Sequence, residues 1–214
     1  MKSRKKSAKK PEKREKKEKK LRILAAGDIH GDKKIAEKLA KRAEKEKVDL
    51  VILNGDITGL VETENLIAPF TKRHEKVIFV PGNWDSQDTA DFLSKKYGIR
   101  NIDNYYVKYK NVGIFGAGAE KLFMDEDKTF KKLKNNFDKI KNLEKKIMVT
   151  HIHAAGTKSE LSGFAGSSGI RKAVEKLQPD LLISGHIHEL EGVEEKIGKT
   201  KVINVGKKGR IIEI

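Results

Sequence analysis

The sequence contains no cysteine, and this absence excludes several kinds of site. A chain of 214 residues without cysteine has no disulfide framework, no cysteine nucleophile, no zinc ribbon and no iron–sulfur cluster. The composition fits a reducing compartment, so we expect a cytoplasmic protein. The sequence also lacks any apolar run approaching the roughly 18 residues that a membrane span needs, so we expect no membrane-spanning segment.

Acidic and apolar residues are both scarce at the N-terminus, and the net charge of +16 is concentrated there. Residues 1–20 contain 12 Lys and Arg against 3 Glu. Such a segment cannot offset its ordering entropy by burial, so we predict a disordered tail at residues 1–20 and one folded domain at residues 21–214. The tail is either a solvated segment or an electrostatic arm for nucleic acid. Because it has no aromatic residue to stack on bases, the solvated segment is the favoured interpretation.

Short apolar runs alternate with amphipathic patterns over residues 21–214. This alternation is typical of an α/β domain with a largely buried sheet. Apparent hairpins at 105–115 and 193–205 indicate that the sheet is mixed and that the C-terminal end is mostly β. We predict strands at 21–26, 48–53, 77–80, 112–115, 147–150 and 181–184, and helices at 32–47, 62–74, 88–97, 126–143 and 168–177.

Five of the predicted strands end in a small polar cluster. Because the carboxyl ends of strands in an open α/β sheet meet in one crevice, we expect these clusters to converge. The pairs Asp28/His30 and His186/His188 are two residues apart, which directs both side chains of a pair the same way off an extended backbone. The clusters are Asp28-Ile29-His30, Asn54-Gly55-Asp56, Gly82-Asn83-Trp84-Asp85, His151-Ile152-His153 and Gly185-His186-Ile187-His188.

The donor atoms in these clusters predict a centre for two transition-metal ions. Five of the six histidines lie in the clusters, and the candidate ligands add two carboxylates and one amide. This mixture of oxygen and nitrogen donors suits Mn, Fe, Zn, Co or Ni better than Ca or Mg. The set is too large for one tetrahedral zinc, and it suits two metals about 3.5–4 Å apart that share a bridging carboxylate. The predicted ligands are Asp28, His30, Asp56, Asn83, His151, His186 and His188.

In these motifs the sequence resembles the calcineurin-like metallophosphoesterase superfamily. The family pattern D-x-H, G-D, G-N-H-D, H and G-H-x-H is met in order from Asp28 to His188, except for the histidine of the third motif. The compact size and the ending Gly-His-Ile-His-Glu resemble small prokaryotic and archaeal members. The resemblance implies a four-layer α/β/β/α sandwich with mixed sheets. It also implies that residues 21–214 form the metallophosphoesterase domain.

The resemblance further implies two sets of metal ligands that share one carboxylate. A water or hydroxide between the two divalent metals, for which manganese is one candidate, would attack phosphorus. No nucleophile from the protein is then required, and Asp56, Asn83 and His151 would belong to the catalytic machinery. The first set consists of Asp28, His30, His188 and Asp56, and the second set consists of Asp56, Asn83, His151 and His186.

One position departs from the family pattern. Trp84 stands where the family usually has a histidine that contacts the phosphate and helps to protonate the leaving group. An indole donates one hydrogen bond but cannot pass on a proton. We therefore expect phosphodiesters, aryl phosphates or nucleotides to be better substrates than alkyl monoesters. Trp84 is either a packing residue or a wall on which a nucleobase stacks.

His153 is a possible substitute for the missing histidine. It lies two residues after His151 in an extended stretch and would face the same cleft, where it could bind substrate and assist catalysis. A histidine in the supporting structure or at the surface is the equally weighted alternative. The Gly- and Ser-rich segment 154–169 would rim the site, as an ordinary loop or a mobile lid, with the helix amides near Ser168 facing phosphate.

Three functions remain open on the sequence alone. The first is a dinuclear metal-dependent phosphoesterase that acts on a small phosphodiester or nucleotide. The second is a nuclease or RNA-processing phosphodiesterase that holds its polymer with the basic residues 1–20. The third is a non-catalytic interaction scaffold on the same fold. Retention of all seven ligand positions argues against the scaffold, because unpaired buried polar groups are costly.

Overall fold

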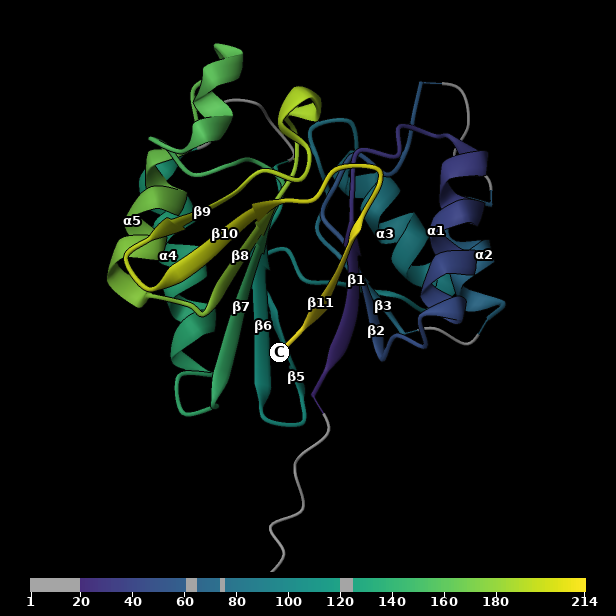
Figure 1. The fold of residues 1–214 in the computed structure, drawn as a ribbon, viewed down its shortest axis with the longest axis horizontal. Helices are drawn as coiled ribbons and strands as arrows, with labels where there is room; N and C mark the ends of the chain where they lie inside the picture. The colour runs from purple at the N-terminus through teal and green to yellow at the C-terminus, as the bar shows by residue number, and fades with distance from the viewer. Residues whose placement is uncertain (1–19, 61–64, 74–75, 120–124) are drawn as a thin grey trace, which may run out of the picture.

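Two β-sheets pack face to face between two layers of helices in the computed structural model, which describes residues 20–60, 65–73, 76–119 and 125–214 (Figure 1). In the first sheet the strand order is β11-β1-β2-β3-β4. Strands β1 to β4 run parallel, and β11 lies antiparallel to β1 at one edge. The strands are β1 (Arg22–Ala26), β2 (Leu50–Leu53), β3 (Val77–Phe79), β4 (Arg100–Asn101) and β11 (Arg210–Glu213).

The second sheet is also mixed, with the strand order β5-β6-β7-β8-β10-β9. Its four central strands run parallel, and an antiparallel strand closes each edge. The strands are β5 (Tyr106–Tyr109), β6 (Val112–Ala117), β7 (Lys145–Thr150), β8 (Leu181–Ser184), β9 (Glu194–Ile197) and β10 (Thr200–Asn204).

Helices cover the outer face of each sheet. Figure 1 shows α1 (Lys33–Lys45), α2 (Ala68–Thr71) and α3 (Gln87–Tyr97) beside the first sheet, and α4 (Glu126–Asp138) and α5 (Ser168–Leu177) beside the second. Two short 3₁₀ helices, η1 (Lys158–Ser162) and η2 (His188–Leu190), lie in loops. Within the described parts of the chain, no helix is long and apolar enough to cross a membrane.

Three apolar layers hold the four layers of structure together. Alternate residues of one strand enter different layers: Ile23 of β1 packs between the sheets, whereas Leu24 packs under the helices. Facing Ile23 across the middle layer are residues of the second sheet such as Ile183. Because the strands are covered on both faces, they read as continuous apolar runs and not as alternating patterns. The four-layer α/β/β/α sandwich expected from the sequence is therefore confirmed.

The predicted elements agree closely with the observed ones. The ranges 181–184 and 168–177 coincide with β8 and α5, and both predicted hairpins are present as β5–β6 and β9–β10. The other predicted strands exist with ends shifted by one or two residues. The predicted tail at 1–20 lies outside the described residues except for Lys20.

The helix predicted at 32–47 is observed at Lys33–Lys45, and two other helices are shorter than predicted by a wider margin. In the described part of 62–74, only Ala68–Thr71 is helical, because Pro69 has no amide hydrogen to donate and is accommodated only in a first helical turn. The helix predicted at 126–143 ends at Asp138, and turns follow it. There Ile140 packs so close to Gly113 that a Cβ at Gly113 would lie 2.7 Å from it.

Candidate metal centre

The five predicted polar clusters lie in loops at the carboxyl ends of β1, β2, β3, β7 and β8. Because these strands run parallel within each sheet, and because the two sheets pack together, the loops meet at one end of the sandwich. All seven predicted ligands are found there, in two neighbouring groups.

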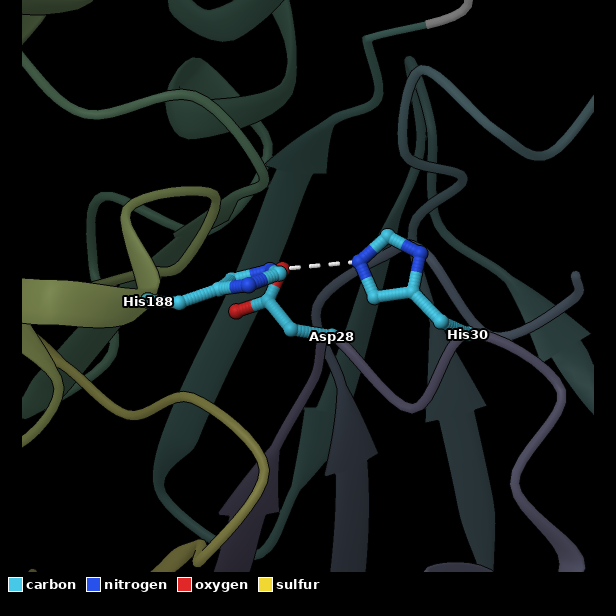
Figure 2. A group of neighbouring side chains, drawn as sticks. All are labelled: Asp28, His30 and His188. Atoms are coloured by element: carbon cyan, nitrogen blue, oxygen red, sulfur yellow. Dashed lines mark hydrogen bonds and ion pairs between the residues drawn. The ribbon is translucent and has the colours of Figure 1, made fainter.

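The first group of side chains joins the loops after β1 and β8. Its members are Asp28, His30 and His188, and one donor atom of each lies within 4.8 Å of the others (Figure 2). Nε2 of His188 lies 3.1 Å from Nε2 of His30 and 3.8 Å from Oδ1 of Asp28. The other oxygen of Asp28, Oδ2, is buried and makes no hydrogen bond to the described residues. An orphaned carboxylate oxygen beside two imidazole nitrogens fits a bound cation.

The second group joins the loops after β2, β7 and β8. Asp56, His151 and His186 again have donor atoms within 4.8 Å of one another. Nε2 of His151 lies 3.3 Å from Oδ2 of Asp56 and 3.0 Å from Oδ1 of Asn83. The rings of His151 and His186 meet edge to face, with centroids 5.1 Å apart.

One oxygen of Asp56 faces both groups. Oδ1 of Asp56 accepts the backbone N–H of Trp84 at 2.9 Å, which leaves Oδ2 turned inward. Oδ2 lies 3.6 Å from Nε2 of His30 in the first group and 3.3 Å from Nε2 of His151 in the second. Asp56 therefore stands between the groups, as a carboxylate shared by two cations would.

The hydrogen bonds of His151 assign its tautomer. Nδ1 lies 2.9 Å from the carbonyl oxygen of Asn54, which can only accept, so Nδ1 carries the proton. In the neutral ring, Nε2 then carries a lone pair, and this lone pair faces oxygens of Asp56 and Asn83. Two acceptors facing a lone pair repel it unless a proton or a cation lies between them, so this arrangement also fits a metal ion.

Burial and neighbouring charges shift the pKa values of these groups. Burial raises the pKa of the Asp28 carboxyl above its ordinary value. Burial alone would also raise the pKa of Asp56, but the hydrogen bond and charge of His151 bring it below the ordinary value. Burial opposes protonation of His151, yet Asp56 raises the pKa of that imidazole. Burial lowers the pKa of His186 to about 4, so its ring is neutral at pH 7 and free to ligate.

The backbone is strained where it presents these side chains. The φ angles of Asp28, His30, Asp56 and His186 are 53°, 48°, 50° and 71°, all in the left-handed region. Each such conformation in a residue other than glycine costs on the order of 1–3 kcal/mol. Tight turns at the strand ends thus aim the side chains inward, and tertiary contacts hold them there.

Asp85 supports the centre and was given no role by the sequence analysis. Its carboxylate is only 1% exposed and accepts the backbone N–H groups of Ile57, Thr58 and Gly82 at 2.9–3.1 Å. It also accepts the hydroxyl of Thr58 at 2.8 Å. Asp85 therefore ties the loop that carries Asp56 to the loop that carries Asn83. The sequence did offer one indication of this role, because Asp85 is the last residue of the Gly82–Asp85 motif.

The predicted substrate-binding residues lie beside the two groups. Trp84 is 46% exposed, and its ring meets that of His30 edge to face at 5.3 Å. His153 is fully buried, its ring lies nearly parallel to that of His186 at 6.4 Å, and neither ring nitrogen makes a hydrogen bond within the described ranges. Burial lowers the pKa of the His153 imidazole.

The helix amides near Ser168 do not face a phosphate site, contrary to the expectation for segment 154–169. The N–H of Gly169 donates to Oε2 of Glu126, and the N–H of Ile170 donates to the hydroxyl of Ser167. These donors are already satisfied. The segment does rim the centre, because the ring of Phe164 contacts that of His186 at 6.2 Å.

Residues 21–190 match the family model described as calcineurin-like phosphoesterase. Since the match covers most of the sequence, the chain belongs to the calcineurin-like phosphoesterase family, whose members are hydrolases of phosphate esters. No curated protein matches this chain in sequence.

Solved structures of low sequence identity share the fold. The protein TT1561 of Thermus thermophilus has a TM-score of 0.70 at 18% identity, covering 91% of this chain and 99% of that one. A dimetal phosphatase from Danio rerio has a TM-score of 0.63 at 12% identity, covering 89% and 88%. A novel archaeal phosphodiesterase has a TM-score of 0.54 at 18% identity, covering 91% and 100%. At these identities the similarity establishes the fold alone.

Proposed function

We propose that this protein is a dinuclear metal-dependent phosphoesterase that hydrolyses phosphodiesters or nucleotide-type phosphate esters. The observation that carries the proposal is the position of Oδ2 of Asp56 between two groups of nitrogen and oxygen donors. The archaeal phosphodiesterase among the structural neighbours supports the choice of diesters. The chemistry that two divalent cations supply when bound is polarisation of the phosphoryl oxygens and acidification of a water molecule.

The residues of this chain divide the remaining work. Asp28, His30 and His188 would hold one cation, and Asn83, His151 and His186 the other, with Asp56 shared. His186, whose pKa is about 4, offers a neutral ring at pH 7. The N–H of Trp84 keeps Asp56 oriented, and the carbonyl of Asn54 holds the proton of His151 on Nδ1. This donor set favours Mn, Fe, Co, Ni or Zn.

Trp84 supports the preference for diesters over alkyl monoesters. Its indole donates a hydrogen bond but cannot pass on a proton, so aryl esters, which need that proton least, should react faster than alkyl esters. The alkoxide released from a nucleoside diester would take its proton from water. Its half-exposed ring beside His30 also suits a wall against the substrate.

His153 enters the proposal as a substrate-contacting group. At its lowered pKa the imidazole is neutral at pH 7, and a neutral imidazole still has one N–H to donate to a phosphoryl oxygen. Its closeness to His186, whose ring lies nearly parallel at 6.4 Å, supports this assignment. Substitution His153→Ala tests it: a fall in kcat of less than a few-fold on every substrate removes His153 from the mechanism.

A panel of metals and substrates tests the function. Mn, Ni, Co, Zn and Mg would be assayed against an aryl monoester, an aryl diester, cyclic nucleotides and RNA. We expect metal-dependent turnover with a preference for diesters. Asp56→Asn should abolish every activity, whereas Asp127→Asn, at an exposed site on α4, should change none. Absence of both metal binding and turnover would contradict the proposal and favour a non-catalytic scaffold.

The same panel tests the nuclease alternative. Deletion of residues 1–20 would abolish salt-dependent activity on RNA while sparing the aryl diester if the tail holds a polymer. Equal loss or equal retention of both activities would argue against that role for the tail.

A further inference from the structure

Two exposed aromatic side chains contact the candidate metal centre, one from each half of the sandwich. Trp84 follows β3 of the first sheet and is 46% exposed. Phe164 lies between η1 and α5, on the side of the second sheet, and is 59% exposed. About half of each side chain remains exposed, so packing leaves on both rings a surface that a ligand can contact.

Each ring contacts a different group of donors. Trp84 meets His30 of the first group, with centroids 5.3 Å apart and planes at 90°. Phe164 meets His186 of the second group, at 6.2 Å and 75°. The two rings therefore contact different groups of the centre, Trp84 the first and Phe164 the second.

Both rings stand on anchored backbone. The amide of Trp84 is bonded to Asp56 at 2.9 Å. The segment around Phe164 is held by Glu160, which accepts the N–H of Gly166 at 2.9 Å. It is held again after Phe164, where the N–H of Ser167 donates to the carbonyl of His153 at 2.9 Å. A platform held in this way loses little conformational entropy when a ligand stacks on it.

Two other exposed aromatic side chains, Phe92 and Tyr105, each contact a cationic side chain. A lysine, Lys96, lies 5.1 Å over the ring of Phe92, and Arg100 lies 5.6 Å over the ring of Tyr105. Those rings serve local cation–π contacts. Trp84 and Phe164 instead contact imidazole rings of the centre.

We infer that the substrate is a linear phosphodiester between two nucleosides, with one base on Trp84, the other on Phe164 and the phosphate at the donor groups. This inference deepens the proposed function and rests on it. A diester has two substituents, and the centre has one platform for each. Base stacking on aromatic rings tolerates any base, so a dinucleotide or a single-stranded oligonucleotide of any sequence would fit.

Trp84 provides a binding assay that does not depend on turnover, because it is the single tryptophan of the chain. Its fluorescence would be followed while phosphorothioate-linked dithymidine, which resists hydrolysis, is titrated into the metal-loaded protein. A one-base ligand, the methyl phosphorothioate diester of thymidine, is the comparison. We expect quenching by both ligands and tighter binding of the two-base ligand.

Variants at Phe164 complete the test. Phe164→Ala should weaken binding of the two-base ligand by roughly 5- to 150-fold, and weaken the one-base ligand less. Phe164→Tyr should restore binding, because it keeps an aromatic face. Leu161→Ala is the matched control, since Leu161 is 81% exposed in the same segment, and it should leave both affinities unchanged. Equal affinity for the two ligands, or equal effects of Phe164→Ala and Leu161→Ala, would overturn the inference.

The outcomes for this inference and for the proposed function are separable. Metal-dependent hydrolysis of an aryl diester without a preference for two-base ligands would support the phosphoesterase function and refute the stacking of two bases on Trp84 and Phe164. If the affinity for the two-base ligand depends on Phe164 but no ester is hydrolysed, the nucleotide-binding site would be supported and the proposed catalytic function contradicted.

Discussion

The backbone amide of Trp84 donates a 2.9 Å hydrogen bond to Oδ1 of Asp56. This bond fixes the carboxylate so that Oδ2 faces both groups of donors. Because the donor is a main-chain N–H, the orientation of Asp56 does not depend on which side chain occupies position 84. The family histidine can therefore be replaced by tryptophan without disturbing the shared carboxylate.

Substitution Trp84→His should change substrate preference and leave metal binding intact. An imidazole can protonate a leaving group, so we expect turnover of an alkyl monoester to rise relative to an aryl diester, by about 10²-fold or more if general acid catalysis is gained. The ratio of the two kcat values is the measurement, with metal content measured in parallel. Phe92→His, at another exposed aromatic, should leave the ratio unaltered. An unchanged ratio in Trp84→His would refute the role assigned to position 84.

Substitution Asp85→Asn should destabilise the centre. The amide keeps one acceptor oxygen but turns an NH₂ group toward backbone N–H donors, so we expect a loss of about 1–3 kcal/mol in the free energy of unfolding. Metal affinity should fall by about 10- to 100-fold, as for other residues that orient ligands. Urea unfolding and metal titration measure the two effects. Asp127→Asn, with a carboxylate at an exposed site, should show neither, and an equally silent Asp85→Asn would remove Asp85 from its supporting role.

Metal binding should stabilise the protein through two sites. At a free metal concentration of 100 times Kd, one site adds about 2.7 kcal/mol to the free energy of unfolding. We expect elemental analysis to find two metals per wild-type chain and one in His188→Ala, because only the first group loses a ligand. Removal of metal with a chelator should lower Tm in both proteins, more in the wild type. A stoichiometry of one in the wild type would contradict the dinuclear assignment.

The hydrogen bond from the Gly166 amide to the Glu160 carboxylate, which holds the segment around Phe164, should weaken in acid. The amides of Gly166 and Gly156 hold the pKa of Glu160 below its ordinary value of 4.5. A carboxyl with a lowered pKa in the folded state stabilises that state above its ordinary pKa, and the contribution is lost as pH falls through the lowered value. We therefore expect protection of the Gly166 amide from hydrogen exchange to fall, after correction for intrinsic rates, as pH drops below 4.5.

Glu160→Gln provides the check at pH 7. The neutral amide is a weaker acceptor, so the Gly166 amide should exchange faster in this variant, and the pH dependence below 4.5 should disappear. Persistence of that pH dependence in Glu160→Gln would assign the anchor to another group.

Elements with strong local patterns were predictable, and elements defined by distant pairing were not. The run Leu181–Ser184 reads as a buried strand because each of its residues is covered. By contrast, β4 has two residues, and β11 exists because Arg210–Glu213 pairs with β1, which lies near the other end of the folded chain. No local pattern in Arg-Ile-Ile-Glu indicates which sheet it joins.

Taken alone, the amino-acid order determined the chemistry of the centre: apolar runs make buried strands, turns end them, and the polar residues of those turns must gather where parallel strands finish. Only the tertiary structure decided how these polar residues are arranged relative to one another. In the fold, Oδ2 of Asp56 faces both groups, Asp85 ties two loops together, Trp84 contacts His30, and Phe164 contacts His186. These relationships depend on sheet order and on contacts between distant residues, which no local periodicity encodes.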